Sequence, residues 1–173
     1  MRVGIFDHFG WAVAVTASAD GVADRRRIEL VEPGIVEAPI HYSRGGLDDA
    51  ALAALVAQVR ASIARAASAE LDALADDLPA PIEWICLRTW PPDFPQDIAV
   101  QRRVPYESRA DAIMYRRSLA DLAEARGWPV HLYVAKDVLA QVPDQVLEAP
   151  RAALGPPWTK DHRIAFAAAI VAG

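Results

Sequence analysis

An aspartate stands at the end of the first apolar segment of this chain. Residues 2–6 predict a strand, Asp7 ends it, and residues 8–10 lead into a second strand that begins at Trp11. A carboxylate at the end of a strand lies at the rim of a sheet, with apolar residues behind it. Asp7 is therefore a candidate metal ligand and catalytic residue, and the alternative is an aspartate that caps a turn.

A second polar cluster, Pro-Pro-Trp-Thr-Lys-Asp-His, occupies residues 156–162 and opens the last predicted helix. Asp161 is a candidate metal ligand and catalytic residue. The alternative is a helix-start charge favoured by the macrodipole, and Thr159 is another candidate cap. His162, like His8, is of a type that ligates transition metals or serves as a general base. A solvated or core role is commoner for histidine, and no histidine pair has zinc-ligand spacing on one helix face.

Several cations are candidates for a phosphate-binding rim. Arg109 and Lys160 stand near predicted helix starts, where a positive charge opposes the macrodipole and needs another reason to be there. Arg88 ends a predicted strand, and Arg102 and Arg103 belong to a long proline-rich loop. The sequence predicts that Arg109, Lys160 and Arg88 bind phosphate.

Other charged and aromatic residues have a simpler expected role. The consecutive arginines at 25–27 and 116–117 are expected on solvated faces. Trp11, Trp90 and Trp158 are of a type that stacks on bases, but a tryptophan more often packs in a core or anchors a loop.

Composition narrows the classes of function. The chain has 173 residues, of which 53% are hydrophobic and 24% charged, so we expect one globular domain spanning 1–173. The net charge of -5 argues against a general polyanion binder but leaves room for a local basic patch. Cys86 is the only cysteine, which rules out an intrachain disulfide and a thiolate metal cluster. No glycine-rich phosphate loop is present. The sequence also lacks a Gly-x-Ser-x-Gly motif and a Cys–His arrangement, which disfavours acyl transfer.

The expected location is the cytoplasm, without membrane association. Residues 3–19 superficially resemble a signal peptide, but Asp7 and His8 break the apolar centre and β-branched residues alternate after them. No apolar run is as long as a bilayer requires. We expect a hairpin there instead.

Periodicity and turn residues predict the element order. Three strands form an antiparallel meander, followed by helix, strand, helix, strand and two further helices. The strands are expected at 2–6, 11–18, 24–31, 82–90 and 129–134. The helices are expected at 47–78, 107–126, 136–147 and 159–172, with loops at 33–46 and 91–105 and a connector at 150–157. The alanine-rich first helix is as suited to a homodimer interface as to a core.

This order resembles the ribonuclease H-like superfamily, and within it the RuvC-like resolvases. The residues that carry the resemblance are Val3-Gly4-Ile5-Phe6-Asp7 with Gly10, similar to the family's first-strand aspartate and turn, and Asp161-His162 opening a buried alanine-rich helix. The resemblance implies an α/β fold with a five-stranded mixed sheet, a three-strand antiparallel meander plus two parallel strands, and helices on both faces.

The resemblance also implies a site. In this fold the first strand is central and the last helix begins at the same rim, so Asp7 and Asp161 would converge there, with Asp48 or Asp49 arriving from the first helix. Such carboxylates suit Mg²⁺ or Mn²⁺, and two such ions clamp a phosphodiester. The simpler role for Asp48 and Asp49 is that of first-turn acids.

One position departs from the family's pattern. Active members carry another acid at or near the end of the fourth strand, where this chain has Arg88. A guanidinium there is expected to pair with Asp7 and to take the charge role of a metal. Asp93 or Glu107 would have to substitute for the missing acid.

Three functions follow as hypotheses. The first is a metal-dependent nucleic-acid phosphodiesterase. The second is a degenerate member that binds nucleic acid or a protein partner without cleavage, which Arg88 and the acidic net charge favour. The third is phosphate handling by analogy with actin-like ATPases, which ranks last because those proteins use two such domains.

Overall fold

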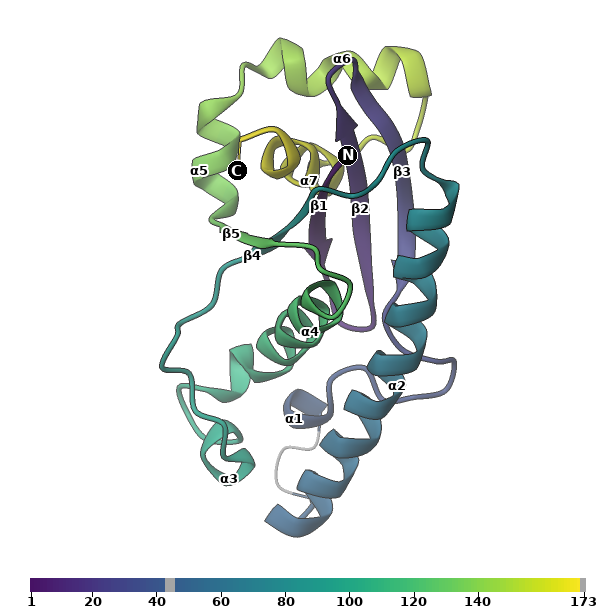
Figure 1. Cartoon of the computed structure of the whole chain (residues 1–173). Helices are drawn as coiled ribbons and strands as arrows, with labels where there is room; N and C mark the ends of the chain where they lie inside the picture. Colours follow the sequence, from purple (N-terminus) through teal and green to yellow (C-terminus); the bar gives the residue numbers. More distant parts are fainter. Residues whose placement is uncertain (43–45, 172–173) are drawn as a thin grey trace.

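Five strands form one mixed sheet in the computed structural model, which describes residues 1–42 and 46–171 (Figure 1). The strand order is β3-β2-β1-β4-β5, with β1 central. Strands β1, β2 and β3 pair antiparallel, whereas β4 pairs parallel with both β1 and β5. The strands are β1 (Arg2–Asp7), β2 (Trp11–Ser18), β3 (Gly21–Glu29), β4 (Trp84–Arg88) and β5 (Val130–Tyr133). The expected α/β class and the five-stranded mixed sheet are confirmed.

Helices cover both faces of the sheet and enclose two apolar clusters. On one face α2 and α4 bury their apolar residues, and on the other face α5, α6 and α7 do so. The helices are α1 (Pro39–Tyr42), α2 (Asp49–Asp77), α3 (Ile98–Gln101), α4 (Glu107–Glu124), α5 (Ala135–Gln141), α6 (Asp144–Leu154) and α7 (Lys160–Val171). The expected last residue of the final helix, 172, lies outside the described residues.

The close approach of α7 to β1 depends on Gly4. A Cβ atom at this position would lie 1.9 Å from the backbone oxygen of Ala165. The alanines of α7 are fully buried, so the helix backbone packs directly against the centre of the sheet. This contact fixes α7 so that its first turn lies at the carboxyl end of β1, where His8 bonds to Asp161.

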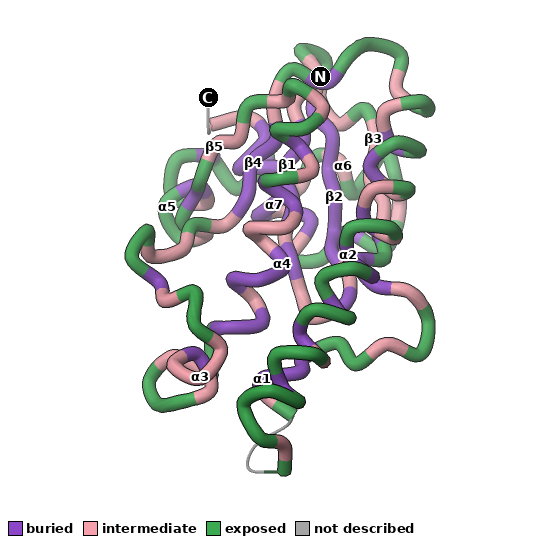
Figure 2. The backbone as a smooth tube through the Cα atoms, turned by 60° about the horizontal axis from the view of Figure 1, so that its bottom comes forward, coloured by how far each residue is buried: buried purple, intermediate pink, exposed green. Residues whose placement is uncertain are grey.

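Helix α2 packs along one side and exposes much of its surface (Figure 2). Asp48 caps it, and its buried stripe joins the core. By length and composition α2 is also apolar enough to cross a membrane. This is weak evidence for a membrane span, because a core helix of a soluble protein passes the same test. The expectation of no membrane association therefore stays a prediction.

The structure has two helices where the sequence predicted one helix at 136–147 and a connector at 150–157, so both predictions are wrong in their bounds. Two helices, α5 and α6, meet at Pro143, which has no backbone N–H and a fixed φ that suits a helix start. Helix α6 then continues through Pro150 and ends at Leu154, and Gly155 follows as its C-cap with a φ of 70°. The pattern was misleading because Pro150 lies in the interior of a short, largely exposed helix.

Two expected loops contain short helices that have no apolar periodicity of their own. The buried carboxylate of Asp111 accepts hydrogen bonds from the backbone N–H groups of Ile40 and His41 and so holds α1. The Asp97 side chain caps α3 by accepting from Ala99 N. Part of the first expected loop, residues 43–45, lies outside the described residues.

Candidate functional site

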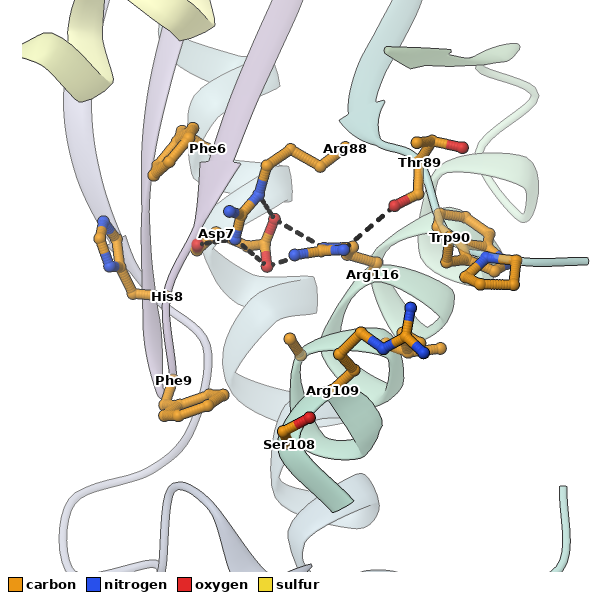
Figure 3. Close-up of a pocket in the computed structure, with 13 residues that line it drawn as sticks. Phe6, Asp7, His8, Phe9, Arg88, Thr89, Trp90, Ser108, Arg109 and Arg116 are labelled. Atoms are coloured by element: carbon orange, nitrogen blue, oxygen red, sulfur yellow. Dashed lines mark hydrogen bonds and ion pairs between the residues drawn. The ribbon is translucent and has the colours of Figure 1, made fainter. Parts of the chain in front are cut away.

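A cavity of about 760 Å³ opens at the carboxyl ends of β1 and β4, beside the N-terminal half of α4 (Figure 3). Its size is typical of sites that hold a small ligand. The lining residues are Phe6, Asp7, His8, Phe9, Arg88, Thr89, Trp90, Pro91, Ser108, Arg109, Ala112, Ile113 and Arg116.

Asp7 lies in the wall of this cavity and is only 2% exposed. The Arg88 guanidinium forms a bidentate ion pair with the Asp7 carboxylate: Nε lies 2.8 Å from Oδ1 and Nη2 lies 2.7 Å from Oδ2. Nη2 also donates to the backbone carbonyl of Asp7. Arg116 Nε lies 3.1 Å from Oδ1 and 3.0 Å from Oδ2 (Figure 3). The expected pairing of Arg88 with Asp7 is confirmed, and both carboxylate oxygens accept hydrogen bonds from guanidinium groups.

Two guanidinium groups share one carboxylate, so the cluster of Asp7, Arg88 and Arg116 has an excess of positive charge. Burial lowers the pKa of Arg88, but the hydrogen bond and the negative charge of Asp7 outweigh it, and the pKa is raised overall. Burial also lowers the pKa of Arg116, and the nearby charge of Arg88 opposes the effect of Asp7, so this pKa stays below its ordinary value.

Arg116 was expected on a solvated face, and that expectation is wrong. The residue is three positions after Ile113 and three before Leu119, which are both buried, so helical spacing turns it toward the sheet. Its Nη1 donates to the backbone oxygen of Thr89 at 3.1 Å, which ties α4 to the residue after β4. That spacing is the signal in the sequence that places Arg116 on the buried face of α4.

The outer part of the cavity has an exposed cation and aromatic rings. Arg109 and Ser108 belong to the first turn of α4 and are exposed, and no side chain caps this helix. Within residues 1–42 and 46–171 the Arg109 guanidinium has no hydrogen-bond partner. Phe9 and Trp90 line the same cavity (Figure 3). The cavity therefore combines cations with flat apolar surfaces.

Asp161 lies at the same edge of the sheet as Asp7, but its hydrogen bond is to His8 and it does not contact the Asp7 cavity. It lies in the first turn of α7, and its Oδ2 accepts a 3.1 Å hydrogen bond from Nε2 of His8. His8 also stacks on Trp11, with ring centroids 4.0 Å apart. Asp161 does not line the Asp7 cavity. Helix α7 therefore begins near the end of β1, but its Asp161 bonds to His8, and the described structure does not bring Asp161 into the cavity with Asp7 as expected.

His162 is 8% exposed and belongs to the packing between α7 and the preceding segment. Its Nδ1 accepts from the backbone N–H of Thr159 at 3.2 Å and lies 2.8 Å from the Thr159 hydroxyl. Burial, helped by the positive charge of Arg25, lowers the pKa of His162. The candidate catalytic histidine thus lies outside the Asp7 cavity and is held in a helix cap.

Arg25 holds the segment 156–162 in place. Its guanidinium donates to four backbone carbonyls, those of Leu154, Gly155, Pro156 and Pro157. Trp158 Nε1 donates to the backbone oxygen of Leu147 at 2.7 Å. The expectation that Arg25 is simply solvated is wrong, and the polar cluster that the sequence singles out is largely a structural anchor.

The remaining candidate metal ligands and phosphate-binding residues do not all lie at the Asp7 cavity. Asp48 is the N-cap of α2 and accepts from Ala51 N at 2.7 Å, while Asp49 pairs with Arg102 at 2.7 Å. Both acids thus have the simpler role. Lys160 is exposed at the start of α7 and does not line the Asp7 cavity, whereas Arg109 and Arg88 do.

These residues do not fit the expected Mg²⁺ or Mn²⁺. Such an ion needs several oxygen ligands. Both oxygens of Asp7 are held by arginines, Asp161 bonds to His8, and Asp48 caps a helix. Within the described part of the chain no group of three or more His, Cys, Asp and Glu residues is arranged to hold a metal ion.

Comparison with known proteins leaves the family open. No family model matches the chain, and no curated protein is significantly similar to it in sequence.

Proposed function

We propose that the protein is a ribonuclease H-like domain that binds nucleic acid at the rim around Asp7 without cleaving it. The observation that carries this proposal is the double engagement of Asp7 by Arg88 and Arg116. Two guanidinium groups take the charge role that metal ions would have beside this carboxylate. Arg88 also stands at the end of β4, where active members of the superfamily carry an acid.

The arrangement of the elements supports the resemblance. Strand β1 is central, Asp7 ends it, and α7 begins at the same edge of the sheet. These are the features that the resemblance implied. Fold-level similarity is a weak warrant for an activity, so the proposal rests on the side chains at the rim.

The chemistry of the cavity favours nucleic acid as the ligand. Arginine guanidinium groups pair with phosphate oxygens, and aromatic rings stack on bases. Arg109 and Arg116 supply the first kind of contact, and Phe9 and Trp90 supply the second. The net charge of -5 keeps this attraction local, so we expect binding at one rim and not over the whole surface.

A binding assay with and without metal tests the proposal. Fluorescently labelled single-stranded DNA and RNA are titrated with the protein in EDTA and in Mn²⁺, and the strands are then run on a denaturing gel. We expect equal affinity in both buffers and intact strands. In Arg109→Gln, we expect weaker binding and a salt dependence whose log–log slope is smaller by about 0.7. Arg103→Gln removes an exposed charge that does not line the cavity and is the matched control.

Metal-dependent cleavage of nucleic acid is the second candidate function. One observation favours it: α7 delivers Asp161 to the residue next to Asp7. Cleavage would require Arg88 and Arg116 to release Asp7 so that its oxygens could bind an ion. Mn²⁺-dependent product formation that is lost in Asp7→Asn would establish this second candidate and overturn the first.

A further inference from the structure

The charge of the Asp7 cavity exceeds what one phosphodiester neutralises. One carboxylate, Asp7, and three arginines, Arg88, Arg109 and Arg116, line it, so these side chains carry a net charge of +2. A phosphodiester contributes a single negative charge. A phosphomonoester contributes about 1.5 to 2 negative charges at neutral pH. The dianion is the better match.

The donors for such an anion are available. Nη2 of Arg116 and the guanidinium of Arg109 have no hydrogen-bond partner among the residues that the structure describes. The Ser108 hydroxyl has only a long 3.5 Å contact with the backbone oxygen of Pro105. These groups come from one wall of the cavity, the side of α4 (Figure 3). Arginine forks are the side chains that recognise phosphate oxygens in pairs.

The cavity also has room for the nucleoside. Its volume of about 760 Å³ exceeds that of a bound phosphate alone and falls in the range of pockets for small ligands. Phe9 and Trp90 provide apolar rings, and Ile113 closes the inner wall, being 3% exposed. A base that stacks on such a ring gains affinity without sequence preference.

We propose that this cavity binds a terminal phosphate together with its nucleotide. The nucleotide is either the end of a nucleic-acid strand, which rests on the proposed function, or a free nucleoside monophosphate. The dianionic phosphate lies against Arg109 and Arg116, and the base lies against the aromatic side chains. Arg88 holds Asp7 in place behind them.

Four forms of one short single strand test the inference, each labelled internally so that the ends stay free. They carry a 5′-phosphate, a 3′-phosphate, two hydroxyl ends, or no ends because the strand is circular. By fluorescence anisotropy, we expect one phosphorylated form to bind about tenfold more tightly than the hydroxyl-ended and circular forms, since charge-assisted hydrogen bonds are lost in those. Adenosine monophosphate, titrated by calorimetry, tests the free nucleotide, and adenosine is its control.

Two variants connect the preference to the cavity. Arg109→Gln removes an exposed cation that has no partner among the described residues, and we expect it to abolish the preference for the phosphorylated end. Arg103→Gln, which is also exposed but lies outside the cavity, should keep that preference. A loss of the preference in Arg103→Gln as well would assign it to general charge and overturn the inference.

The outcomes separate this inference from the proposed function. If all four strands bind equally well, the inference is overturned and nucleic-acid binding stands. If adenosine monophosphate binds in an Arg109-dependent way and no strand binds, the cavity chemistry is supported and the proposed function fails. If neither strands nor nucleotide bind, both are overturned.

Discussion

The Asp7 cavity and the segment 156–162 both depend on arginine side chains, three in the cavity and Arg25 at the segment, but the partners of these side chains differ. Arg25 has its guanidinium surrounded by the backbone carbonyls of residues 154–157, which accept its hydrogen bonds. In the cavity, two arginines share Asp7 and Arg109 has no partner in the described structure. The first cluster has its donors satisfied by backbone carbonyls, whereas the second includes donors that have no acceptor among the described residues.

The two regions show how a structural anchor is told apart from a candidate binding site. Residue type alone does not do so, because both clusters contain arginine, histidine and aspartate. The criterion is whether the chain itself supplies the acceptors. Backbone carbonyls are abundant where α6 ends and the chain turns at Gly155, and they are scarce where a strand and a helix start border a cavity.

The largest expected effect comes from Asp7→Ala. The change removes the carboxylate that Arg88 and Arg116 share, and it leaves both guanidinium groups unpaired in a largely buried environment. Breaking a buried ion pair typically costs 3–5 kcal/mol, and because both arginines keep some exposure we expect a loss near the lower end, about 3 kcal/mol in the free energy of unfolding. Urea denaturation measures it. Asp7→Asn, which keeps one carbonyl acceptor, should lose less, and equal stability of Asp7→Ala and wild type would contradict the description of the cluster.

Arg25→Ala should have the next largest effect. It removes the donors for the carbonyls at the end of α6, and we expect a loss of about 2 kcal/mol. Arg27→Ala is the matched control on the same strand, because its side chain is 53% exposed and pairs with Glu29 on the surface. We expect it to cost less than about 1 kcal/mol. Similar losses in the two variants would show that Arg25 is no anchor.

Arg109→Gln is expected to affect nucleic-acid binding and to leave the stability of the fold nearly unchanged. Its stability should stay within about 0.5 kcal/mol of wild type, since the side chain is exposed and makes no hydrogen bond in the described structure. Its affinity for nucleic acid should nevertheless fall. Thermal unfolding of the free protein and anisotropy with a labelled strand measure the two effects. A large loss of stability would place Arg109 with the structural arginines.

The smallest expected effect is a pH dependence that comes from His162. Its pKa is lowered in the folded state by burial and by Arg25, while Asp161 opposes this shift. The unfolded chain therefore binds more protons once the pH falls below the ordinary value of 6.5, and the folded state loses stability from there downward. We expect wild type to lose more stability between neutral and mildly acidic pH than His162→Gln does. A parallel decline of both proteins would show that His162 does not contribute.

The fold was largely predictable because apolar periodicity determines it. The meander, the long first helix and the buried last helix follow patterns of period 2 or 3.6 that tertiary packing preserves. The division of α5 from α6 was not predictable by that means, since it depends on the proline positions and on the hydrogen bonds of the turn. The short helices α1 and α3 depend on side-chain caps, one of which comes from Asp111, 70 residues away from His41.

The site was only partly predictable for a related reason. Asp7 and Arg88 were identifiable because each ends a strand, and strand ends that are parallel neighbours meet at one edge. Arg116 was misjudged as a surface residue, although its spacing from Ile113 placed it on the buried face of α4. Arg25 was misjudged because its partners are backbone carbonyls, which no residue pattern shows.

Calorimetric titration with Mn²⁺ tests the central claim, that arginine and not metal occupies the rim beside Asp7. We expect no saturable binding in wild type and the same flat titration in Asp7→Asn, because Arg88 and Arg116 already hold both carboxylate oxygens. Saturable Mn²⁺ binding in wild type that disappears in Asp7→Asn would contradict this claim and would establish a carboxylate metal site at the end of β1.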